Sequence, residues 1–212
     1  MPERWVCLDV GETLVNESRI WTCWADALGI SRFTFMAAMG AVLARGGDFR
    51  DTFKFLGFND WERHRTQVMV AFGGFQEHDL YPDAKPTLDA LRAAGFRLAV
   101  VGNQPASRTD ELRFLGVRAE VMTMSEEMGV QKPDHAFFEE TLRLIGNPAP
   151  QNVAYVGDRL DNDVRPAALA GMRPVWLKRG PWAVITTDSP PAGTLVVGSL
   201  TELAERIDEA WA

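Results

Sequence analysis

The spacing of apolar and polar positions divides this chain into two kinds of segment. A short apolar run near the N-terminus, Trp5–Leu8, predicts a buried strand, and no comparable run follows until about residue 80. The intervening stretch carries apolar residues at helical spacing, interrupted by glycines and by Ser or Asp residues suited to helix N-caps. The four helices predicted there are Ile20–Leu28, Arg32–Ala44, Phe49–Leu56 and Trp61–Phe72.

From Pro82 onward the pattern changes to strands that alternate with helices. The predicted strands are Arg97–Val101, Glu120–Thr123, Val153–Val156, Pro174–Leu177 and Leu195–Val197. The predicted helices are Ala84–Ala94, Arg108–Leu115, Ala136–Ile145, Val164–Ala170 and Leu200–Ala210. This alternation predicts an α/β fold with a doubly wound parallel sheet. We therefore expect an α/β core domain over residues 1–15 and 80–212, and an inserted all-helical domain over residues 16–79.

Composition narrows the classes of partner. The 212-residue chain has a formal net charge of −7 and scattered basic residues, so we expect no nucleic-acid partner and no anionic membrane surface. No apolar run approaches the length of a membrane span, and no signal-peptide pattern begins the chain. The only two cysteines, Cys7 and Cys23, are typical of reduced thiols in a cytoplasmic protein. The oligomeric state is left open.

Carboxylates stand at the ends of two apolar strands. Asp9 directly follows Trp5–Leu8, and Asp158 follows a second apolar run, with Asp161 and Asp163 close behind. Carboxylates in such places are costly to desolvate unless something compensates them. Ligands and metals gather at the C-terminal edge of parallel sheets. The sequence therefore predicts a divalent cation between the two strand ends, and we interpret Asp161 as a solvated loop residue.

Taken in their order along the chain, the motifs at the strand ends resemble those of the haloacid dehalogenase-like (HAD) hydrolase superfamily, and the resemblance covers nearly the whole chain. The family's first motif, Asp-x-Asp-Gly-Thr-Leu, is matched at Asp9, Thr13 and Leu14. Its second, a strand ending in Ser or Thr and often followed by Asn, corresponds to Gly102-Asn103. The third and fourth are matched by Lys132-Pro133 and by Gly157-Asp158 through Asp163. The resemblance implies a Rossmann-like HAD core, and the helical insertion resembles the family's C1-type cap.

The resemblance also implies a role for each carboxylate. Asp9 would be the nucleophile that attacks phosphorus and forms an aspartyl-phosphate. Mg²⁺ would offset the repulsion between this carboxylate and the phosphate dianion. Its ligands would be the Asp9 carboxylate, the backbone carbonyl of Gly11, and Asp158. Asp163 would hold a metal-bound water or orient Lys132.

Two further residues complete the implied site. Lys132 would neutralise charge on Asp9 and on the phosphoryl group. Asn103 would donate to a phosphoryl oxygen, alongside backbone N–H groups of the loop after Asp9. Gly102 replaces the Ser or Thr of the second motif and removes one hydroxyl donor, for which a backbone N–H or the Asn103 amide could partly substitute.

Position 11 departs from the family pattern. Gly11 replaces the second Asp of the first motif, which protonates the leaving group and later activates water in the family's phosphatases. Such an acid/base group typically contributes about 10²–10⁴-fold. Glu12 could replace it as a catalytic residue, or could point away from the site or order the loop.

Three functions remain open. The first is a Mg²⁺-dependent hydrolase of a small phosphorylated metabolite, slowed by the loss at Gly11. The second is a metal-independent 2-haloacid dehalogenase-like enzyme, which the acidic cluster disfavours. The third is a catalytically silent domain that binds a phosphate compound or a protein partner. We expect the first, with substrate specificity in the cap segments Glu17–Trp24 and Arg45–Phe55, where Arg19 and Arg50 are candidate contacts.

Overall fold

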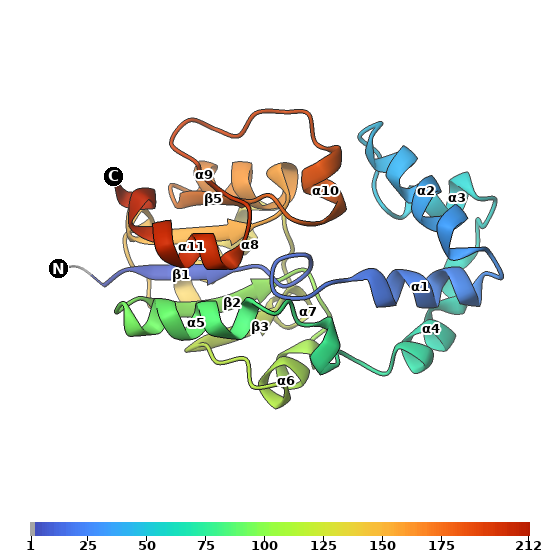
Figure 1. The fold of residues 1–212 in the computed structure, drawn as a ribbon, viewed down its shortest axis with the longest axis horizontal. Coiled ribbons are helices and arrows are strands. Elements are labelled where there is room, and N and C mark those ends of the chain that lie inside the picture. Colours follow the sequence, from blue (N-terminus) through green and yellow to red (C-terminus); the bar gives the residue numbers. More distant parts are fainter. Residues whose placement is uncertain (1–2) are drawn as a thin grey trace. The chain divides into compact units, whose positions relative to one another are not determined.

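The computed structural model describes residues 3–212, which divide into two compact units (Figure 1). The first unit is the segment ending at Asn16 together with Gln76–Ala212, and the second is Glu17–Phe75. The second boundary thus falls after Phe75 rather than after residue 79. Residues 76–79 belong to the first unit because they bond to it: the Asn16 N–H donates to the Asp79 carbonyl at 2.8 Å.

The first unit is built on a six-stranded sheet in which every neighbouring pair is parallel. The strands are β1 (Trp5–Leu8), β2 (Arg97–Gly102), β3 (Val121–Met124), β4 (Val153–Gly157), β5 (Arg173–Leu177) and β6 (Leu195–Val197). Their order, β3-β2-β1-β4-β5-β6, places β1 at the point where the winding reverses direction. The predicted doubly wound α/β fold is confirmed.

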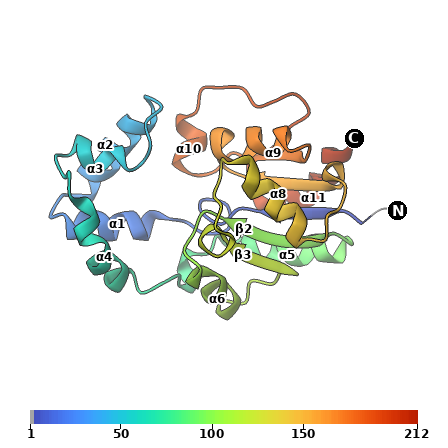
Figure 2. The same ribbon diagram turned by 180° about the vertical axis from the view of Figure 1, so that it is seen from behind.

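Helices cover both faces of the sheet. Those of the first unit are α5 (Ala84–Ala93), α6 (Ser107–Phe114), α7 (Ser125–Met128), α8 (His135–Leu144), α9 (Arg165–Leu169), α10 (Gly180–Ile185) and α11 (Leu200–Arg206). Helices α5 and α11 lie on the face turned toward the viewer in Figure 1. Helices α8 and α9 lie on the opposite face, which is in front in Figure 2. Burial on both faces explains why the strands are continuously apolar rather than alternating.

Alternate side chains of three strands build the core beneath α8 and α9. The cluster consists of Trp5, Cys7, Ala99, Val101, Phe137, Phe138, Ile145, Val153, Tyr155, Ala167 and Met172. Phe138 packs edge-on against Tyr155, with ring centroids 5.2 Å apart. This packing fixes the central strands, and therefore the positions at which they end.

The second unit is helical, as the sequence predicts. It contains α1 (Ser18–Ala27), α2 (Arg32–Leu43), α3 (Asp51–Phe55), the 3₁₀ turn η1 (Trp61–His64) and α4 (Arg65–Phe72). Aromatic rings form its core: Phe53 stacks on Trp61 at 4.4 Å and meets Trp24 edge-on at 4.8 Å. Within residues 3–212 no single helix has the length and apolar composition to cross a membrane; α1 and α2 meet those criteria only as a pair bent by 113°.

Candidate active site

The candidate site lies where β1, β2 and β4 end side by side. Asp9 directly follows β1, and its N–H donates to the Val156 carbonyl at 2.9 Å. Asp158 directly follows Gly157, the last residue of β4. Oxygens of Asp9, Asp158 and Asp163 all lie within 4.8 Å of one another, and all three residues are buried. The carboxylates that the sequence predicts to converge are therefore brought together.

Lys132 lies between two of these carboxylates. Its Nζ is 2.6 Å from Asp9 Oδ1 and 2.6 Å from Asp163 Oδ1, and its side chain is 1% exposed. Burial alone would lower the pKa of Lys132, but the charges of Asp163 and Asp9 outweigh it and hold that pKa well above its ordinary value. The ammonium group is therefore charged at neutral pH and compensates part of the carboxylate charge.

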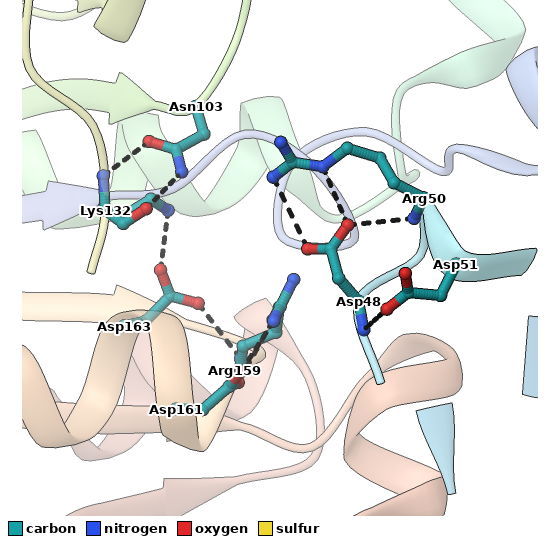
Figure 3. Close-up of polar contacts among 8 residues, drawn as sticks. All are labelled: Asp48, Arg50, Asp51, Asn103, Lys132, Arg159, Asp161 and Asp163. Atoms are coloured by element: carbon teal, nitrogen blue, oxygen red, sulfur yellow. Dashed lines mark hydrogen bonds and ion pairs between the residues drawn. The ribbon is translucent and has the colours of Figure 1, made fainter. Parts of the chain in front are cut away.

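Asn103 fixes the main chain of Lys132 (Figure 3). Its side-chain amide nitrogen donates to the Lys132 carbonyl at 2.8 Å, and the Lys132 N–H donates to Asn103 Oδ1 at 2.8 Å. One amide group thus satisfies both polar groups of the same residue, which determines its orientation. In this structure the Asn103 side chain supports the main chain of Lys132. Its contact with a phosphoryl oxygen stays a prediction.

Asp163 lies in the π-helical turn η4 (Leu160–Val164), which follows β4. The Arg159 N–H donates to Asp163 Oδ2 at 3.0 Å. A Cβ at Gly157 would lie 2.4 Å from Asp163 Cγ, so only glycine leaves room for this side chain. The pKa of Asp163 is raised to about 6. Burial is the largest cause and the charge of Asp9 adds to it, while the charge of Lys132 acts in the opposite direction.

Asp158 carries an uncompensated oxygen. Among the described residues its Oδ2 is buried and has no hydrogen-bond partner, while its backbone carbonyl accepts from the Trp176 indole at 2.8 Å. Burial and the nearby charges of Asp163 and Asp9 raise the pKa of Asp158 well above its ordinary value. A hard divalent cation prefers such oxygen ligands and would offset these costs. The residues present therefore fit Mg²⁺.

Gly102 closes the site on the β2 side. A Cβ at this position would lie 2.7 Å from Asp9 Oδ1 and 3.1 Å from Val10 Cγ2, so any side chain would require the loop after β1 to move. Gly102, where the family has Ser or Thr, is thus the residue that leaves room for Asp9 in this chain. Its phosphate contact stays a prediction.

Gly11 and Glu12 form the turn after Asp9. The left-handed backbone of this turn is at Glu12, with φ of 50°, and Gly11 is not among the described residues with positive φ. Glu12 is 5% exposed, and its carboxylate accepts a hydrogen bond from the Tyr81 hydroxyl at 2.6 Å. The Glu12 carboxylate is thus engaged with Tyr81, and its role in proton transfer stays a prediction.

Arg159 lies beside the site, although no sequence motif marks it. Its guanidinium donates to both oxygens of Asp161, at 3.1 and 2.6 Å, and lies 5.4 Å from the ring of Trp182. Asp161 is exposed, as expected for a solvated loop residue, and it is paired with Arg159. The sequence feature that indicates a place for Arg159 near the site is its position directly after Asp158.

Both candidate substrate contacts of the helical unit have partners within that unit. Arg50 Nε donates to Asp48 Oδ1 at 2.7 Å (Figure 3). The guanidinium of Arg19 donates to the carbonyls of Phe72 and Gly74 and lies over the Phe72 ring. Arg19 therefore joins the two ends of the helical unit.

Comparisons with known proteins agree with this geometry. A family model described as haloacid dehalogenase-like hydrolase matches residues 4–171. The chain is 32% identical over 206 residues to phosphoserine phosphatase of Thermus thermophilus, covering 91% of this chain and 80% of that one. It is 43% identical over 103 residues to glyceraldehyde 3-phosphate phosphatase of Methanopyrus kandleri, covering 47% of this chain and 44% of the relative. It thus matches less than half the length of that protein.

Solved structures share the fold. A putative HAD-hydrolase from Bacillus subtilis, solved with magnesium, superposes with a TM-score of 0.74 at 18% identity, covering 98% of this chain and all of that one. A 2-haloacid dehalogenase from Pseudomonas syringae superposes with a TM-score of 0.61 at 20% identity over the full length of both chains. From the family match, the relative that covers 91% of this chain and the strand-end carboxylates, we conclude that this chain belongs to the haloacid dehalogenase-like hydrolase family.

Proposed function

We propose that the protein is a Mg²⁺-dependent phosphatase that hydrolyses a small phosphate ester through an aspartyl-phosphate on Asp9. The observation that carries this proposal is the cluster of three buried carboxylates around Lys132. The phosphoserine and glyceraldehyde 3-phosphate phosphatases similar to this chain support a small phosphorylated substrate.

Asp9 and Lys132 account for the transfer step. A carboxylate oxygen of Asp9 attacks phosphorus while the bond from phosphorus to the ester oxygen breaks, and the leaving alkoxide takes a proton from solvent. Water then attacks the aspartyl-phosphate, which releases inorganic phosphate and regenerates the carboxylate. Lys132 orients Asp9 through the 2.6 Å contact and places a positive charge beside the transferred group.

Asp9, Asp158 and the carbonyl of Gly11 would hold Mg²⁺, with Asp163 in a supporting position. When bound, the cation supplies charge neutralisation between the nucleophile and the phosphate dianion. The chain needs such compensation. At 4.8 Å and an effective dielectric near 20, each carboxylate pair repels by about 3 kcal/mol, and Lys132 supplies one positive charge for three carboxylates.

The same imbalance disfavours the dehalogenase alternative, which would leave the carboxylates without a cation. Dehalogenases are among the structural neighbours, but at 20% identity they share the fold alone. A catalytically silent domain would have no need of the buried contact between Lys132 and Asp9. We also propose that Glu17–Phe75 acts as a C1-type cap that selects the substrate.

A substrate screen tests this function. Phosphoserine, glyceraldehyde 3-phosphate, p-nitrophenyl phosphate and 2-haloacids are each incubated with Mg²⁺ and with EDTA. Release of phosphate that requires Mg²⁺ and is lost in Asp9→Asn supports the proposal. Halide release in EDTA would support the dehalogenase instead, and the absence of turnover on every compound would favour a binding domain.

A further inference from the structure

Glu12 is held in place by its side chain. It follows Gly11 in the turn after Asp9, and the residue is 5% exposed. The Tyr81 hydroxyl donates to Glu12 Oε2 at 2.6 Å, and the Tyr81 N–H donates to the Leu14 carbonyl at 2.9 Å. Tyr81 therefore contacts the turn twice, once through its side chain and once through its main chain.

The backbone of Glu12 is also constrained. Its φ of 50° is the left-handed conformation that residues other than glycine rarely adopt. Its N–H donates to the Val15 carbonyl at 2.7 Å. The peptide group between Gly11 and Glu12 carries the Gly11 carbonyl, so a fixed φ and a fixed side chain at Glu12 together fix the direction of that carbonyl. Backbone outliers of this kind concentrate where function requires them.

Gly180 leaves room for the Glu12 side chain. Gly180 is the first residue of α10, and a Cβ there would lie 2.6 Å from Glu12 Oε2 and 2.8 Å from Glu12 Cβ. Its neighbour Arg179 adds another connection. The Arg179 guanidinium lies 4.1 Å from the centre of the Tyr81 ring and donates to the Thr13 carbonyl at 3.2 Å. Segments distant in sequence thus enclose one carboxylate.

We propose that Glu12 is a positioning residue: held by Tyr81 and Gly180, it fixes the Gly11 carbonyl for the cation and is not a proton-transfer group. The inference rests on the cation site of the proposed function. Tyr81 and Arg179 act through the same turn. The purpose of the buried carboxylate is then to keep the loop that carries Asp9 in its cation-binding form.

The test measures Mg²⁺ affinity and proton transfer separately. Isothermal calorimetry gives the Kd for Mg²⁺ of the wild type, Glu12→Gln and Tyr81→Phe, without any turnover. We expect both variants to bind Mg²⁺ about tenfold more weakly, as is usual when a group that supports a metal ligand is removed. At saturating Mg²⁺, kcat should stay within about fivefold of wild type, and the pH profile of kcat should keep the shape of the wild-type profile.

Two further variants keep the test decisive. Glu12→Gly suits the left-handed backbone, so it should fold while losing the side chain, and it should also weaken Mg²⁺ binding. Glu202→Gln is the matched control, because this glutamate accepts from the Gly198 N–H and Arg206 on α11 and should leave the Kd unchanged.

Two results would overturn the inference. One is an unchanged Kd in all three variants of Glu12 and Tyr81. The other is a loss of kcat of about 100-fold or more in Glu12→Gln at saturating Mg²⁺, together with a pH profile of kcat that differs in shape from the wild-type profile. If the variants lose Mg²⁺ affinity but the wild type hydrolyses no phosphate ester, the inference stands and the proposed function fails. If the wild type hydrolyses phosphate esters and the Kd for Mg²⁺ is the same in all variants, the proposed function stands and the inference about Glu12 fails.

Discussion

The Nζ of Lys132 lies 2.6 Å from Oδ1 of Asp9, although 123 residues separate them in sequence. This buried ion pair joins the third motif to the first. Removing one partner of a buried pair commonly costs about 3–5 kcal/mol, because the other charge remains without compensation. Here the remaining charge would belong to a cluster of three carboxylates.

Lys132→Met should therefore lower the free energy of unfolding without Mg²⁺ by about 3 kcal/mol at pH 7. The loss should shrink toward pH 5, since the carboxylates of Asp158 and Asp163 have raised pKa values and take up protons. Urea unfolding at both pH values checks this. Lys85→Met, which removes an exposed pair with Glu77, is the control and should cost much less. Equal losses in the two variants would show that Lys132 does not compensate the charge of the buried carboxylates.

Gly102→Ala tests the close approach of β2 to Asp9. The added Cβ would lie 2.7 Å from Asp9 Oδ1, so either Asp9 or the strand must shift. We expect a stability loss of about 1–3 kcal/mol and a kcat at least tenfold lower. Gly40→Ala in α2 has no heavy atom within 4 Å of the added Cβ and should not destabilise the protein. An unchanged kcat in Gly102→Ala would show that the close approach of β2 does not fix the position of Asp9.

Gly11→Asp tests the missing acid of the first motif. The positive φ of the turn lies at Glu12 and not at Gly11, so left-handed backbone strain does not oppose a side chain at position 11. The added carboxyl group should raise kcat on an alkyl phosphate, with a smaller gain on p-nitrophenyl phosphate, whose leaving group needs little protonation. Steady-state kinetics on both substrates measure the difference. A folded variant with flat or lower rates on both would count against the loss of an acid at this position.

The ion pair of Asp83 with Arg179 should make stability depend on pH. Burial raises the pKa of Asp83, but the hydrogen bond and charge of Arg179 outweigh it, and the net pKa lies below the ordinary 3.8. A depressed pKa contributes stability that is complete above 3.8 and is lost as pH falls through the folded-state value. The stability difference between wild type and Asp83→Asn should therefore narrow below about pH 4. Urea unfolding between pH 7 and 3 measures it; a constant difference would contradict the assignment.

Much of the fold and the acidic part of the site could be predicted because both depend on local patterns. Apolar runs mark the strands, and a carboxylate after such a run, as at Asp9 and Asp158, marks the edge where ligands gather. The short helices α7 and α10 were not predicted, since four and six residues carry too little periodicity. The C-terminal helix was predicted as one element, but it changes to a 3₁₀ turn at Ile207–Trp211.

The supporting contacts could not be predicted because they join main-chain atoms or distant segments. Asn103 bonds the backbone of a residue 29 positions away, and Tyr81 reaches Glu12 across 69 positions. Nothing in the sequence indicates that Gly180 makes room for Glu12, because the requirement exists only once α10 is placed beside the turn. The cytoplasmic location expected from the sequence stays a prediction.

The most direct test of the central claim is detection of the covalent intermediate. The protein is mixed with substrate and Mg²⁺, quenched in acid within milliseconds to seconds, digested, and analysed by mass spectrometry. We predict that the peptide containing Asp9 gains the mass of one phosphoryl group, that the gain requires Mg²⁺, and that Asp9→Asn abolishes both the gain and phosphate release. Phosphate release that persists in Asp9→Asn, or a phosphoryl group found on another residue, would contradict the account.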